Sequence, residues 1–155
     1  MVEHQTEDDR RRQLAVATVF AERYDWELHE YESRFAVIDL YLTDKHRDQI
    51  TGLCEVKCRP EYKHDEFDTI YVSFNKWYRL YLASVAFNVP GWIVFWYGAD
   101  LYVRSLNVER VFTQPGCNLA IRGRTGRKNA ANDLEPMILV PRTLLHTVAT
   151  KVKVD

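Results

Sequence analysis

The stretch ITGLCEVKCRP, residues 50–60, carries Glu55 and Lys57 inside a strand pattern that is otherwise rich in apolar side chains. Successive side chains of a strand point to opposite faces, so Glu55 and Lys57 share one face. Cys54 and Val56 occupy the other face. We expect the second face to join the core and the first face to carry chemistry.

The patterns around this strand indicate an α/β fold whose elements follow the order α-β-β-β-α-β. Thr6 and Asp9 form a capping-box pattern ahead of apolar residues at helical spacing. A second helical period begins at Ser73 and ends at Pro90. Strands are predicted at 26–31, 34–43 and 50–58, on both sides of a turn at 98–100, and at 136–141 before a final helical turn. We expect a central mixed sheet flanked by helices.

Length and charge limit the organisation of the chain. A chain of 155 residues fits one domain, 1–155. We place its core at about 10–105 and treat 106–155 as a C-terminal extension with a basic loop. The formal net charge of −1 argues against a generally basic protein. Any contact with nucleic acid would therefore depend on local basic patches.

Neither the N-terminal residues nor the longest apolar run indicates a secreted or membrane-spanning protein. The first twelve residues, MVEHQTEDDRRR, are too polar for a signal peptide. The longest apolar run, around 89–97, contains a Pro-Gly pair and is too short to span a bilayer. Three cysteines without metal-binding companions are expected to be thiols in a reducing compartment. We expect a cytoplasmic protein with no membrane partner.

The strands at 34–43 and 50–58 are predicted to pair as a hairpin about the polar turn 44–49. With the centre of that turn near Arg47, Asp39 falls opposite Glu55. Opposed Cβ atoms of an antiparallel pair lie about 4.5–5.5 Å apart, so the two carboxylates would repel each other. A divalent cation removes this conflict. The simpler alternative is a pair of solvated carboxylates, one of them bridged to Lys57.

Mg2+ suits this predicted arrangement. It takes hard oxygen ligands and keeps several waters, so two carboxylates and a substrate phosphate can complete its coordination. The backbone carbonyl of Val56 could add a ligand. Lys57, about 6.6–6.8 Å along the strand from Glu55, would lie beside a metal-bound water that it could orient or deprotonate. Together these groups predict phosphodiester hydrolysis.

Asp39, followed after fifteen residues by Glu55-Val56-Lys57 within this order of elements, resembles the PD-(D/E)xK nuclease superfamily. The resemblance covers about residues 10–105. It implies a restriction-endonuclease-like core and DNA as the partner. It further implies that Asp39 and Glu55 bind Mg2+ or Mn2+ and that Lys57 assists the attacking water. Ile38 stands where the nominal motif has proline, a common variation.

The resemblance also implies two helical contributions. Many members add an acidic residue from the first helix, which Glu22 would supply unless helical register turns it to solvent. Many place a basic residue near the scissile phosphate on the helix after the motif strand. Lys76 is the best match, with Arg79 behind it, although both could equally form the solvated side of an amphipathic helix.

A dense basic cluster follows residue 121, in the segment RGRTGRK. It could contact phosphates, or it could be a solvated loop. The cluster consists of Arg122, Arg124, Arg127 and Lys128.

A second acidic-x-lysine match, Glu61-Tyr62-Lys63, follows Pro60 in a polar loop, whereas Glu55 interrupts an apolar strand. Context therefore favours Glu55 and Lys57. His46 and His64, also in polar loops, are expected to be ordinary surface residues.

The leading hypothesis is a small Mg2+- or Mn2+-dependent deoxyribonuclease of phage or mobile-element type, in the host cytoplasm if a phage encodes it. A homodimer would supply the two sites that a two-strand cut needs. The alternative is a non-catalytic nucleic-acid-binding or assembly module with the same fold. RNA stays open as a substrate.

Overall fold

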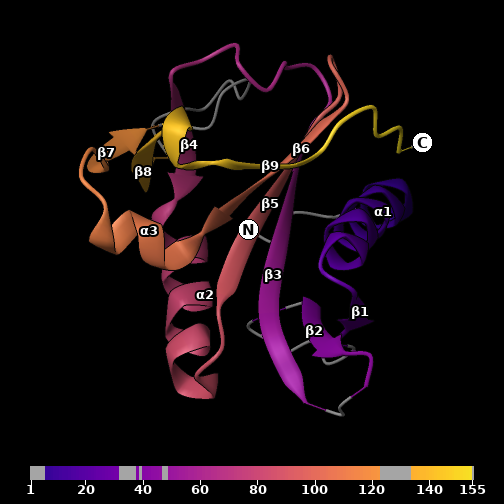
Figure 1. The fold of residues 1–155 in the computed structure, drawn as a ribbon. Helices are drawn as coiled ribbons and strands as arrows, with labels where there is room; N and C mark the ends of the chain where they lie inside the picture. The colour runs from indigo at the N-terminus through magenta and orange to yellow at the C-terminus, as the bar shows by residue number, and fades with distance from the viewer. Residues whose placement is uncertain (1–5, 32–37, 39, 47–48, 123–133, 155) are drawn as a thin grey trace.

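The computed structural model describes residues 6–31, 38, 40–46, 49–122 and 134–154. They form a six-stranded sheet and a smaller three-stranded sheet, with helices packed against both faces of the larger one (Figure 1). The predicted α/β fold, with a central mixed sheet flanked by helices, is confirmed.

The larger sheet is mixed. Its middle strands, β3 and β5, run parallel, and every other neighbouring pair is antiparallel. β5 is buried along nearly its whole length, as its apolar sequence GWIVFWY requires of a strand covered on both faces. The strand order is β1 (Trp26–Glu30), β2 (Leu40–Asp44), β3 (Ile50–Arg59), β5 (Gly91–Tyr97), β6 (Tyr102–Asn107) and β9 (His146–Ala149).

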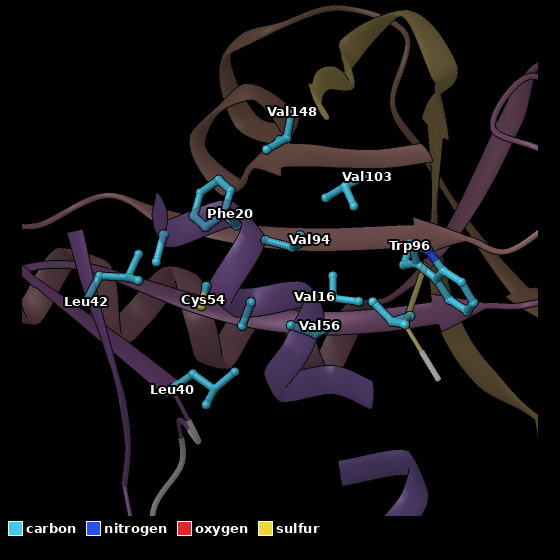
Figure 2. Close-up of a cluster of buried hydrophobic side chains, with 13 residues drawn as sticks. Val16, Phe20, Leu40, Leu42, Cys54, Val56, Val94, Trp96, Val103 and Val148 are labelled. Carbon is cyan, nitrogen blue, oxygen red and sulfur yellow. The ribbon is translucent and has the colours of Figure 1, made fainter. Parts of the chain in front are cut away.

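The first helix, α1 (Glu7–Arg23), covers one face of this sheet. The predicted capping box is present: the Asp9 amide donates to the Thr6 hydroxyl, and the Thr6 amide donates to the Asp9 carboxylate. Phe20 of the helix is fully buried in a cluster that includes Cys54 and Val56 of β3 (Figure 2). The face of β3 that the sequence assigned to the core is therefore the face beneath α1.

The second helix, α2 (Phe74–Phe87), covers the opposite face (Figure 1). It begins after Ser73, whose hydroxyl accepts from the backbone amide of Lys76, and it ends at Asn88 in a left-handed conformation. Trp77 is buried, and its indole Nε1 donates to the Val108 carbonyl at 2.9 Å. This hydrogen bond satisfies the polar atom of a large core side chain.

The smaller sheet, in the order β4, β8, β7, was not expected as a unit. The sequence predicted β8 and the helical turn after it, but not β4, β7, β9 or α3. Each of these is short, and the strands gain their hydrogen bonds from partners distant in the chain, which local periodicity does not report. Their bounds are β4 (Thr69–Ser73), α3 (Val108–Thr113), β7 (Asn118–Arg122), β8 (Glu135–Pro141) and the 3-10 helix Arg142–Leu144.

The predicted hairpin register is found from Leu40 to Leu42 of β2. Leu40 pairs with Cys54, and Leu42 pairs with Gly52. An irregularity after Leu42 then moves the pairing by one residue, so Thr43 faces Ile50. Of the predicted strand 34–43, residues 34–37 and Asp39 lie outside the described part of the chain.

Among the helices of the described residues, none combines the length and the apolar character needed to cross a membrane.

Candidate active site

Glu55 and Lys57 lie on the face of β3 that is turned towards α2. Leu53, two residues before Glu55, packs in the cluster that contains Trp77 and Leu80 of α2. The alternating Cys54 and Val56 pack beneath α1. The two charged side chains are therefore on the same face, as the strand period predicted.

Apolar side chains border the two charged residues on the neighbouring strand. In the parallel register, Glu55 lies beside Ile93 and Lys57 beside Phe95, and both of these β5 residues are almost fully buried. Arg104 of β6 follows Phe95 in the same row. The charges of Glu55 and Lys57 are therefore shielded from water on the side of β5, which strengthens their electrostatic interactions.

Lys57 and Lys76 come together from different elements. The Ser73 cap fixes the start of α2, so that Lys76 lies in its first turn and its half-buried side chain meets Lys57. Burial is the main cause that lowers the pKa of Lys57, repulsion and hydrogen bonding from Lys76 lower it further, and the sum brings it to about 8. Glu55 acts in the opposite direction. Lys57 can therefore lose its proton near neutral pH.

The Glu55 carboxylate is half-buried, and within the described part of the chain it is engaged in neither a hydrogen bond nor a salt bridge. A carboxylate in that state offers hard oxygen atoms to a divalent cation. Because partly buried charges need a partner, the donor chemistry at this point of β3 fits Mg2+ or Mn2+. Asp39, the predicted second carboxylate, lies outside the described residues.

Glu22 is not brought to this site. It is exposed in the last turn of α1, where its charge helps to raise the pKa of Lys45. α1 packs on the face of β3 opposite to Glu55. The register of the helix therefore points Glu22 to solvent, which is the second of the two outcomes that the sequence allowed.

The predicted basic residues are spread over two regions. Arg79 is exposed on α2, close to one turn beyond Lys76. Arg122 is exposed at the end of β7, with its guanidinium carbon 5.8 Å from the centre of the Tyr71 ring. Three members of the predicted cluster lie outside the described residues: Arg124, Arg127 and Lys128.

The structure also shows a cluster that the sequence did not indicate. Ligand atoms of His64, Asp65 and Asp100 lie within 4.8 Å of one another, a donor set that could hold a metal ion. His64 Nδ1 is 2.5 Å from the Asp100 carboxylate, and its ring stacks on Tyr102 with centroids 3.6 Å apart. The side chain of His64 is 21% exposed, so its prediction as an ordinary surface residue was wrong.

This cluster lies on the same sheet face as Lys57, because Tyr102 pairs with Tyr97, and Tyr97 pairs with Arg59, two residues beyond Lys57. His64 and Asp100 are 36 residues apart in the chain. No local pattern could have joined them.

A family model described as "Phage putative PDDEXK endonuclease" matches residues 2–148. Among solved structures, Hjc, a Holliday junction resolvase from the archaeal hyperthermophile Archaeoglobus fulgidus, is similar at 15% identity. The match covers 83% of this chain and 87% of that one, with a TM-score of 0.49. A search of curated protein sequences gave no significant match.

Proposed function

The chain belongs to the family of phage PD-(D/E)xK endonucleases, and we propose that it hydrolyses phosphodiester bonds of DNA with a divalent metal ion and an activated water. One observation supports this most strongly. Glu55, Lys57 and Lys76 converge from β3 and α2 on one half-buried surface, with Lys57 poised to lose its proton near neutral pH.

The proposed metal ligands are Asp39, Glu55 and the backbone carbonyl of Val56. The register of the described β2–β3 pairs, which reaches Leu40 and Cys54, supports the pairing of Asp39 with Glu55. Bound Mg2+ or Mn2+ would supply Lewis-acid chemistry, lowering the pKa of a coordinated water and offsetting phosphate charge. Glu22 is left out of this set because α1 lies on the opposite face of the sheet.

Lys57 is proposed to orient the attacking water and to accept its proton. A base whose pKa lies near the working pH combines an appreciable neutral fraction with a useful proton affinity. Lys76, whose positive charge lowers the pKa of Lys57, is proposed to donate to a non-bridging oxygen of the scissile phosphate. The same ammonium would thus tune the base and bind the substrate.

The proposed partners are DNA and a second copy of this chain. Exposed apolar side chains line α2: Leu82 is 47% exposed, and Val85 and Phe87 are each 59% exposed. No charged residue occurs from Leu80 to Ala99. Such a patch is typical of an association surface, and two copies would provide two active sites for a two-strand cut. We further propose that residues 1–155 act as one nuclease domain in the host cytoplasm.

Cleavage of a substrate panel tests the proposed function. The panel contains supercoiled plasmid, linear duplex, single strand, four-way junction and RNA, each with Mg2+, Mn2+ or EDTA. Cutting of DNA that requires the metal and is lost in Glu55→Gln is the expected result. Cutting that persists in EDTA, or that survives in Glu55→Gln, would contradict the proposed metal site.

A further inference from the structure

The three-stranded sheet has one face turned away from the core. Val72 of β4 and Ile138 and Val140 of β8 are buried against the cluster that contains α2. Residues of the opposite parity therefore point outward. In the register of the sheet, Tyr71 of β4 and Asn118 of β7 both align with the same residue of β8 and so share this outward face.

Tyr71 presents its ring on that face. The residue is 46% exposed, a large value for an aromatic side chain in a strand. The Arg122 guanidinium carbon lies 5.8 Å from the ring centre, within the range of a cation–π contact. An aromatic ring and a guanidinium thus stand together on the outward face of the three-stranded sheet.

The charge of the surrounding residues favours a nucleic-acid strand, which is anionic, as the ligand of this outward face. Residues 110–122, which include β7, contain two arginines and no aspartate or glutamate. Glu135 of β8 lies opposite Arg122 in the register, so a phosphate would compete with that carboxylate for the guanidinium. This neighbour should weaken anion binding without preventing it.

The strand that carries Tyr71 leads directly into the helix that carries Lys76. β4 ends at Ser73, the residue that caps α2, and Lys76 follows in the first turn of that helix. A DNA backbone held at Lys76 therefore needs to pass only the end of β4 to reach Tyr71. In a duplex, however, the faces of the bases are covered by stacking on their neighbours. An exposed ring can stack only on an unpaired base.

We propose that Tyr71 and Arg122 form a binding site for an unpaired nucleotide, in which the base stacks on Tyr71 and its phosphate contacts Arg122. The substrate class is then DNA that contains a single-stranded segment beside the scissile phosphate. This inference rests on the proposed function, because it extends the same substrate path.

Binding is measured on the Glu55→Gln background by fluorescence anisotropy in EDTA, with a labelled single-stranded oligonucleotide and the duplex of the same sequence. Tyr71→Leu keeps an apolar strand residue but removes the ring, and it should weaken single-strand binding about 5- to 150-fold while changing duplex binding little. Tyr71→Phe should retain the affinity. Glu135→Gln should tighten single-strand binding, because Arg122 loses its competing carboxylate.

Phe112→Ala is the matched control. Phe112 is 73% exposed, but it contacts Tyr81 of α2 rather than the outward face of the sheet. Unchanged single-strand binding in Tyr71→Leu, or an equal loss in Phe112→Ala, would overturn the proposed site. Either result would leave metal-dependent cleavage by the wild-type protein intact. Failure of the proposed function would instead appear as the absence of that cleavage.

Discussion

The ammonium of Lys76, in the first turn of α2, lies against the side chain of Lys57 on β3, and this neighbour together with burial lowers the pKa of Lys57 to about 8. Contact between two like charges on a half-buried surface is unfavourable when no ligand is bound. A bound phosphate would relieve the repulsion. The pair is therefore arranged for an anionic substrate.

The first prediction is a pH profile. Only the neutral amine of Lys57 accepts a proton, so the rate of cleavage should rise with pH and level off above about 8. Lys76→Met removes the neighbouring charge, which raises the pKa of Lys57 and moves the profile to higher pH. Arg79→Met is the control, because that side chain is exposed on the same helix. Identical profiles in both variants would contradict the role given to Lys76.

A second prediction concerns metal binding. Titration calorimetry with Mn2+ should show heat in the wild-type protein and its loss in Glu55→Gln, because a neutral amide is a poor ligand for a hard cation. Glu22→Gln should bind as the wild type does, since Glu22 is exposed to solvent on α1, the helix that packs on the sheet face opposite to Glu55. Loss of heat only in Glu22→Gln would show that Glu22, and not Glu55, is the metal ligand. No heat in the wild type would favour the non-catalytic module.

Core packing gives a third prediction. Phe20 is fully buried between α1 and the sheet (Figure 2). Phe20→Ala should lower the free energy of unfolding by about 3–5 kcal/mol, because it removes apolar contacts and leaves a cavity. The exposed Phe112 provides a comparison: Phe112→Ala should change that free energy by about 0.5 kcal/mol or less. Urea denaturation measures both, and similar losses in the two variants would contradict the burial of Phe20.

Self-association is the subject of a fourth prediction. Leu82→Glu places a charge in the exposed apolar patch of α2, so it should shift the protein from dimer to monomer. Light scattering coupled to size-exclusion chromatography measures the mass of each variant. A wild-type protein that is monomeric at every concentration, or a Leu82→Glu protein that stays dimeric, would exclude this surface as the interface.

The sequence predicted the central part of the fold because strong local patterns specify it. The capping box at Thr6, the cap at Ser73 and the apolar run of β5 each act within a few residues. The alternation along β3 placed Glu55 and Lys57 on one face, and the turn between the strands predicted the register of the β2–β3 pairs from Leu40 to Leu42, although not the shift at Thr43.

The remainder depends on contacts that local patterns do not contain. β4 is held by β8, which lies more than sixty residues later in the chain. His64 meets Asp100 across a separation of 36 residues. Glu22 points outward because another side of α1 packs on the sheet. The weak amphipathic pattern in the last turn of α1 did not show which side that would be. The contact between Lys57 and Lys76 required the packing of α2 to be known.

The role of Lys57 as the general base is tested most directly by single-turnover cleavage of DNA with Mg2+ by Lys57→Ala and Lys63→Ala. Both residues end an acidic-x-lysine tripeptide, but Lys63 is exposed in a turn region while Lys57 meets Lys76. Lys57→Ala is expected to lower the rate by about 10²- to 10⁴-fold, as loss of a general base does, whereas Lys63→Ala is expected to leave the rate unchanged. A wild-type rate in Lys57→Ala, or a comparable loss in Lys63→Ala, would contradict this role of Lys57.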